Sequence, residues 1–279
     1  MRPEKLLILA ILMAAVGGCA RPPAFYETMG DDGVITRVEA GMDQEPELAS
    51  SEVRASMESY KAQRMALASD AGAAGAAISA RPHGGSAASD DYDPFIERDC
   101  PPEGSASSAR YKQLNRLKNR ITAPSISDME PVVTLAALRA PGNDEDRWST
   151  GHAATIEGYV RSAKGTGKET CNCKASSRRL TDTHLDIVAD ANDDGYPVVA
   201  EITPPMRLIH EHHGLEDWSS AAIKSHYEGR RVRISGWLFF DEHHRTGAEN
   251  TDPGDMRGEK NWRATCWEIH PITHIELAE

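Results

Sequence analysis

The sequence predicts a mostly β domain with one or two helices, preceded by a long N-terminal segment of low complexity. Five short segments rich in β-branched and aromatic residues follow one another between residues 152 and 277, with turn residues between them. By contrast, the tracts 71–91 and 100–109 consist largely of Gly, Ala, Ser and Pro, which bury little apolar surface. The C-terminal part holds all five tryptophans and ten of the eleven histidines, so any chemistry is expected there.

The N-terminus has the layout of an export signal. Arg2 and Lys5 precede the apolar run LLILAILMAAV, which is too short to span a bilayer as a mature helix. The run ends in VGGC, which resembles the lipobox of bacterial lipoproteins and so implies a lipid on Cys19. Ala20 after it implies the outer membrane, if the cell is Gram-negative. Residues 1–18 are therefore predicted to be a lipoprotein signal peptide, with acyl chains such as palmitate holding the mature chain to the membrane of the cell envelope. An ordinary signal peptide that happens to contain a cysteine is the alternative.

Residues 19–109 are predicted to be a tether that keeps the folded domain clear of the membrane surface. Within the tether, the segment 46–70 is predicted to be helical, because Val53, Met57 and Tyr60 recur at helical spacing with no Gly or Pro between them. The alternative is that this segment packs onto the domain that follows.

The C-terminal domain, residues 110–279, is predicted to contain five strands and one clear helix. The helix is expected at 218–229, with Ser219 or Ser220 as its N-cap, and 131–142 is either a short helix or another strand. The strands are expected at 152–163, 183–189, 197–204, 230–240 and 262–277. Five strands with a helix between the third and fourth is the order of an OB-type barrel, which is therefore the predicted architecture. Another small, mostly antiparallel α+β domain is the alternative.

Short motifs of this domain add a resemblance. They are LKNR, EGYV, CNC, DTHLDIV, EITP, SGWLFFD and NWRATCWEIHPIT. In combination they resemble an uncharacterised group of bacterial, often exported, OB-like domains, over about residues 111–279. The resemblance implies a single domain. The group has no established activity, so the resemblance implies no catalytic residues.

Export would place four further cysteines in an oxidising compartment, where disulfides form. Cys171 and Cys173 are separated by one residue, a spacing that strains a bond between them. Either of them could instead bond Cys100 or Cys266, and the sequence leaves this pairing open. A zinc site built on the CNC motif is a further alternative, although the usual CxxC spacing is absent.

Alternation along the predicted strands separates polar from apolar side chains. In the strand at 183–189, for example, His184 and Asp186 share one face with the preceding Asp182. A small barrel has one core, so the apolar faces are expected to point inward and the polar faces outward.

Six polar residues on these faces are candidate catalytic residues, since neighbouring strands could bring them together. They are His184, Glu201, Asp241, His243, Glu268 and His270. Imidazole and carboxylate groups form general acid–base pairs or bind divalent metals, so a divalent metal is the cofactor that the pattern suggests. The alternative is that these residues only solvate the outer face of the barrel.

The segment DANDDGYPVVAE matches the ligand spacing of an EF-hand calcium loop, with Asp190, Asn192, Asp194 and Glu201 at ligand positions. Strands rather than helices are predicted on both sides, so a hairpin turn is the expected structure. The segment HEHHG at 210–214 lacks the second histidine of HExxH, and its histidines are predicted to lie in a flexible surface segment.

A ligand-binding surface is predicted around Trp237, Trp262 and Arg263. Tryptophan with arginine binds polyanions or sugars, and a structural role at strand edges is the alternative. Further basic residues near the barrel are Arg178, Arg179, Arg230, Arg231 and Arg233. The net charge of −12 argues against general binding to nucleic acid. GxSxG, P-loop and GxGxxG motifs are absent from strand-to-helix junctions, which argues against serine hydrolases, NTPases and dinucleotide enzymes.

The sequence therefore predicts a membrane-anchored exported lipoprotein whose barrel binds a ligand or protein partner of the cell envelope. The alternative is a metal-dependent hydrolase, such as a phosphodiesterase or nuclease-like enzyme, acting through the six candidate residues. A purely structural envelope protein is a third reading, which the patterned polar faces argue against.

Overall fold

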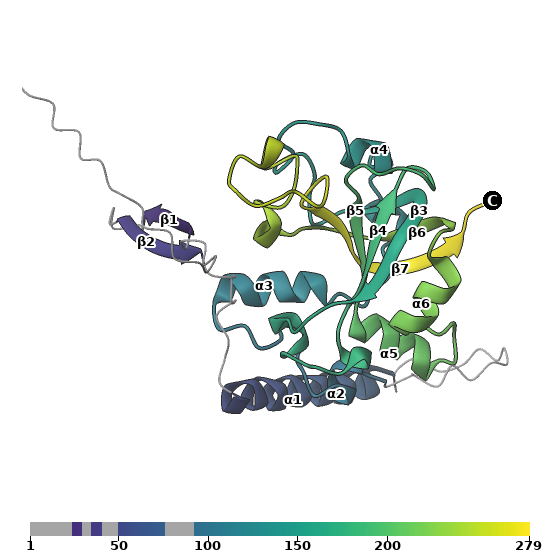
Figure 1. The fold of residues 1–279 in the computed structure, drawn as a ribbon. Coiled ribbons are helices and arrows are strands. Elements are labelled where there is room, and N and C mark those ends of the chain that lie inside the picture. Colours follow the sequence, from purple (N-terminus) through teal and green to yellow (C-terminus); the bar gives the residue numbers. More distant parts are fainter. Residues whose placement is uncertain (1–23, 30–34, 41–49, 76–91) are drawn as a thin grey trace, which may run out of the picture. The chain divides into compact units, whose positions relative to one another are not determined.

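The computed structural model describes residues 24–29, 35–40, 50–75 and 92–279 (Figure 1). The chain forms two compact units, Met1–Gln44 and Glu45–Glu279. The first contains an antiparallel hairpin of strands β1 (Ala24–Met29) and β2 (Ile35–Ala40). The predicted signal peptide and Cys19 lie outside the described residues. Among the helices in the described ranges, none combines the length and the apolar character needed to cross a membrane.

Five strands of the second unit form a closed barrel, as predicted. They are β3 (Ala153–Gly165), β4 (Thr183–Val188), β5 (Val198–Ile202), β6 (Arg231–Phe240) and β7 (Trp267–Leu277). Their order around the barrel is β3-β4-β5-β7-β6, and β6 pairs with β3 to close it. All neighbours are antiparallel except β5 and β7, which are parallel. The last strand begins five residues later than predicted, at Trp267.

The apolar faces of these strands point into the barrel, as the alternation predicts. Ile156 of β3 lies opposite Ile234 of β6, and Leu185 of β4 lies opposite Ala200 of β5, which in turn lies opposite Ile269 of β7. All five side chains are completely or almost completely buried. Because a barrel has a single interior, this cluster is the main core of the unit.

The expectation of a mostly β domain with one or two helices is wrong, because the described residues contain six α-helices. They are α1 (Ser50–Gly75), α2 (Pro94–Glu97), α3 (Ala109–Lys118), α4 (Leu135–Leu138), α5 (Pro204–His212) and α6 (Ser220–Tyr227). The fold is therefore mixed α/β. Helix α6 matches the predicted helix, and the Ser219 hydroxyl accepts a hydrogen bond from the backbone N–H of Ala222. Helix α5 begins at Pro204 and Pro205, which suit the first turn of a helix, where a backbone N–H has no partner. It includes the first residues of HEHHG, which is thus helical at its start.

The helix expected near 46–70 is α1, and its first half packs against the folded unit. Met57 is buried, and the ring of Tyr60 meets that of Phe95 in α2 edge to face, with centroids 5.8 Å apart. The Arg64 guanidinium lies 2.8 Å from the Asp93 carboxylate. Residues 92–109, which the sequence placed in the tether, thus carry contacts of the folded unit.

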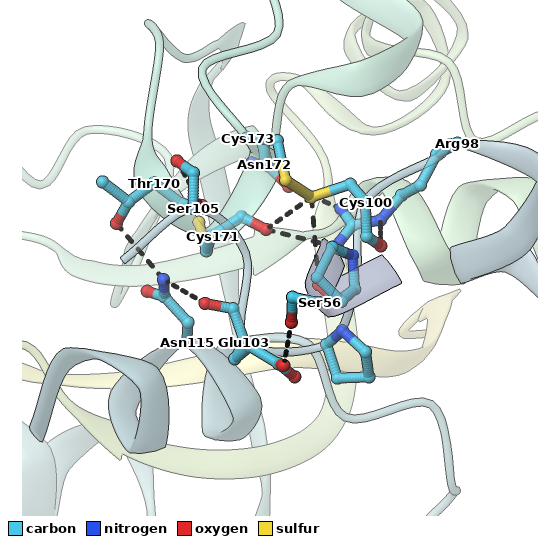
Figure 2. The surroundings of a disulfide bond; sticks show 12 residues. Ser56, Arg98, Cys100, Glu103, Ser105, Asn115, Thr170, Cys171, Asn172 and Cys173 are labelled. Carbon is cyan, nitrogen blue, oxygen red and sulfur yellow. Dashed lines mark hydrogen bonds between the residues drawn. A yellow bond between two sulfur atoms is a disulfide. The ribbon is translucent and has the colours of Figure 1, made fainter. Parts of the chain in front are cut away.

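A disulfide between Cys100 and Cys173 joins the segment 92–109 to the loop between β3 and β4, at residues 166–182 (Figure 2). It is one of the pairings that the sequence left open, and it is consistent with a secreted protein. Around it, Arg98 donates to the carbonyl of Cys171 and to the side chain of Asn172. The disulfide and these bonds fix the loop against the segment that precedes the barrel.

Candidate functional site

Four of the six candidate residues lie in contact on the outer face of three adjacent strands. His184 of β4 lies beside Glu201 of β5, with 3.1 Å between Nδ1 and Oε1. His270 of β7 lies with its Nδ1 3.0 Å from Glu268 and 3.7 Å from Glu201. The strand order β4-β5-β7 produces this convergence, because it places three polar faces side by side.

These four side chains are buried, which corrects the expectation that the outer polar faces lie in solvent. His270 is 0% exposed and Glu201 only 7% exposed. Lys118, the last residue of α3, reaches over this face, with its ammonium 3.3 Å from Glu169 and 3.4 Å from Asp241. Helix α3 and the loop after β3 thus cover the polar face. Both segments are distant in sequence from Glu201 and His270, which they help to bury.

Buried hydrogen bonds set the protonation of this network. Burial opposes a charge on His184, but hydrogen bonds to Asp186 and Glu201 outweigh it and raise the pKa of His184 to about 9. Burial likewise opposes a charge on Glu201, but the bond from His184 and the nearby His270 lower the pKa of Glu201 to about 2. His184 is thus a cation held between two carboxylates.

Sequence reasoning gave no role to Asp182, which lies next to this network. It is fully buried, and one carboxylate oxygen accepts a hydrogen bond of 3.0 Å from the Asn172 amide. Ligand atoms of Asp182, Glu201 and His270 all lie within 4.8 Å of one another, and so do those of Asp182, Glu169 and Cys171. In the sequence, only the alternation that groups Asp182 with His184 indicated that Asp182 belongs to this network. The other residues around Asp182 come from segments distant in sequence.

Asp241 and His243 lie at the edge of this network. The Asp241 carboxylate pairs with Lys118 and accepts a hydrogen bond from the backbone N–H of His243. The His243 ring stacks on Tyr111 of α3, with centroids 5.2 Å apart. Lys118 therefore links Asp241 to the network, whereas His243 contacts the covering helix.

The three predicted ligand-binding residues do not form one open groove. Arg263 is completely buried, and its guanidinium lies 2.6 Å from Glu268. The Trp237 indole donates to the Thr122 carbonyl, and the Arg120 guanidinium lies 4.6 Å from its ring centre. Trp262 is partly exposed, with its ring beside Arg263.

The predicted calcium-loop residues also separate. Asp190, Asn192 and Asp194 lie in the turn between β4 and β5, whereas Glu201 lies in β5 and contacts His184. Asp193, which the pattern does not use, organises the turn by accepting from the backbone N–H groups of Ala189 and Gly195. Among the described residues, the groupings of potential metal ligands leave these turn residues out.

A pocket of about 810 Å³ lies beside the barrel, in the size range of small-molecule sites. The end of β3, the loop after it, helix α5 and the start of α6 form its walls. Leu215, Trp218 and Ala163 are among its apolar residues. The sequence did not predict this pocket, because α5 was not expected.

The pocket is lined by charges of both signs, with basic residues in excess. The basic residues are Lys164, Arg178, Arg179, Lys224 and the buried Arg207, and the acidic ones are Glu211, Glu216 and Asp217. Arg179 pairs with two glutamates, whereas the exposed Arg178 donates to the Gly165 carbonyl and keeps further donors for a ligand.

Neither protein-family models nor curated proteins match this chain. The resemblance to exported OB-like domains therefore stays a prediction.

Proposed function

We propose that this protein is an exported lipoprotein, held to the membrane of the cell envelope by a lipid on Cys19, whose OB-like barrel binds a small amphipathic anion. The signal-like N-terminus supports the anchor, and the Cys100–Cys173 disulfide agrees with an oxidising compartment.

The strand order supports the OB-like assignment. In barrel order the first, second, third, fifth and fourth strands follow one another, and the helices α5 and α6 stand between the third and fourth. OB domains use the loop between their first two strands in ligand binding. Here that loop supplies Arg178 and Arg179 to the pocket.

The pocket is the observation that carries the binding function. Glu211 in the lining is paired with Arg179, and Glu216 accepts from the Tyr227 hydroxyl, so basic groups remain in excess. An apolar wall with this excess of basic groups suits a ligand that has an apolar body and an acidic group. The Arg178 guanidinium is the group best placed to meet the acidic end, since it is exposed and donates to a backbone carbonyl, that of Gly165.

The geometry favours binding over the alternative of hydrolysis. A hydrolase acting on phosphodiesters needs its acid–base groups within reach of a substrate in solvent. The convergent residues His184, Glu201, Glu268 and His270 are at most 7% exposed, beneath α3 and the loop after β3.

Two fluorescent probes test the binding function. The protein used for this test is exported, so that the disulfide forms, and its mature chain begins at Ala20. Anilinonaphthalene sulfonate is an amphipathic anion, and phenylnaphthylamine has similar rings without the charge. We expect the sulfonate to bind more tightly. Arg178→Glu should weaken sulfonate binding about tenfold, or about 1.4 kcal/mol, and leave the neutral probe unchanged. Leu215→Asp should weaken both.

Arg161→Glu is the matched control, because Arg161 is also an exposed arginine that donates to a glycine carbonyl, outside the pocket. Equal losses in the Arg161 and Arg178 variants would rule out this pocket as the anion site. The lipid anchor is tested separately by palmitate labelling, which Cys19→Ser should abolish.

A further inference from the structure

We propose that Asp182, Glu201 and His270 bind a divalent metal of the zinc class in the buried face of the barrel. One ligand atom from each residue lies within 4.8 Å of the other two. Asp182 also belongs to the neighbouring group with Glu169 and Cys171, so potential ligands surround it on two sides. This site is distinct from the pocket and does not depend on the ligand-binding function.

Two buried polar atoms at this site lack hydrogen-bond partners within the described part of the protein. They are Oδ1 of Asp182 and Nε2 of His270. Both residues are 0% exposed, so bulk water does not reach them. Buried polar groups in native proteins are nearly always paired, so two unpaired atoms within a group of potential ligand side chains point to a cation-binding site.

The charge at Asp182 gives the same indication. Its carboxylate is completely buried, and the carboxylates of Glu169 and Glu201 lie beside it in the two groups of potential ligands. The ammonium of Lys118 bonds Glu169 and Asp241 and is not hydrogen-bonded to Asp182. A cation between Asp182 and Glu201 would relieve the repulsion between carboxylates that burial makes strong.

Two arginines approach Asp182 from outside the group, and other partners occupy their donors. Arg98 bonds the Asn172 amide oxygen and two backbone carbonyls. Arg207 bonds Thr183 and the carbonyls of Arg179, Thr181 and Trp218. These bonds hold the segment that carries Asp182 in place, and neither guanidinium is hydrogen-bonded to its carboxylate.

The donor set selects the class of metal. Carboxylate oxygen with imidazole nitrogen, next to the Cys171 thiol, suits zinc and its first-row neighbours, whereas calcium and magnesium prefer oxygen ligands and bound water. A carboxylate commonly holds a metal-binding histidine from behind. Glu268 contacts His270 in this way at 3.0 Å and is itself paired with Arg263.

Metal analysis of the full chain tests the proposal. The protein is exported with its disulfide intact, extracted in mild detergent through a tag without histidine, and analysed for all first-row metals. We expect about one zinc ion per chain. Asp182→Asn and Glu201→Gln should each lower the metal content by more than about tenfold. Asp186→Asn is the matched control, because Asp186 is a carboxylate of the same face that contacts His184 and Ser162 and lies outside the group.

A second measurement needs no variant. Cobalt(II) added to metal-free wild-type protein should produce visible d–d absorption bands that saturate at about one ion per chain, and zinc should abolish them. Absence of saturable cobalt bands in folded protein would overturn the proposal. So would undiminished metal content in the Asp182 and Glu201 variants. A variant that loses its near-UV circular dichroism has lost its tertiary structure, so its metal content does not test the proposal. The cobalt titration of the wild-type protein then tests it alone.

Discussion

Removal of the Cys100–Cys173 disulfide should lower the free energy of unfolding by about 4 kcal/mol. The two cysteines are 73 residues apart, and the enclosed loop contains α3, α4 and β3. In the chain-entropy description, the bond stabilises the fold by restricting the unfolded chain, and a loop of this length corresponds to about 4 kcal/mol. Replacing both cysteines with alanine keeps the apolar surroundings of the buried Cys100 and avoids a new polar group.

Urea denaturation, monitored by near-UV circular dichroism, measures this loss of unfolding free energy. The same decrease is expected when wild-type protein is reduced, and reduction should leave the double variant unchanged. Cys266→Ala is the control, because Cys266 is a buried cysteine outside the disulfide, and its loss should cost about 1 kcal/mol while the sensitivity to reduction remains.

The refuting result is specific. If the double variant loses no more stability than Cys266→Ala, the cross-link does not restrict the unfolded chain as argued. The segment before the barrel would then be held by noncovalent contacts alone, such as the edge-to-face contact of Tyr60 with Phe95 and the ion pair of Arg64 with Asp93.

Two further predictions concern the barrel and its turn. Gly236→Ala should destabilise the protein by about 2 kcal/mol or more in urea denaturation, because the new methyl would lie 2.2 Å from the Pro271 carbonyl oxygen. Gly167→Ala, in open space, should be nearly neutral, and similar losses of stability at both sites would contradict the steric argument. The hydrogen bonds from Arg139 hold the pKa of Asp193 well below its usual range. The resulting stabilisation should be complete above about pH 5 and should be lost as the pH falls from there through the lowered pKa. Asp193→Asn should therefore differ from wild type in unfolding free energy at pH 7 and converge with it in acid, and a difference independent of pH would show that the ion pair is not its source.

The sequence by itself determined the barrel strands and their inward faces. Alternation in segments such as THLDIVA is a local property, and it places Leu185 and Ile187 in the core whatever surrounds the strand. The cap of α6 at Ser219 is equally local. Local patterns also indicated that His184, Glu201, Glu268 and His270 share the outer face.

Only the tertiary structure decided what covers that face and what joins it. Lys118 arrives from α3, Asp182 acquires Glu169 and Cys171 through the loop after β3, and Cys173 pairs with Cys100. The pocket depends on α5, which the sequence did not predict and whose first turn contains Pro204 and Pro205. These features rest on contacts between segments far apart in the chain, which periodicity along one strand does not encode, so polar residues that alternate like a solvated face are buried instead.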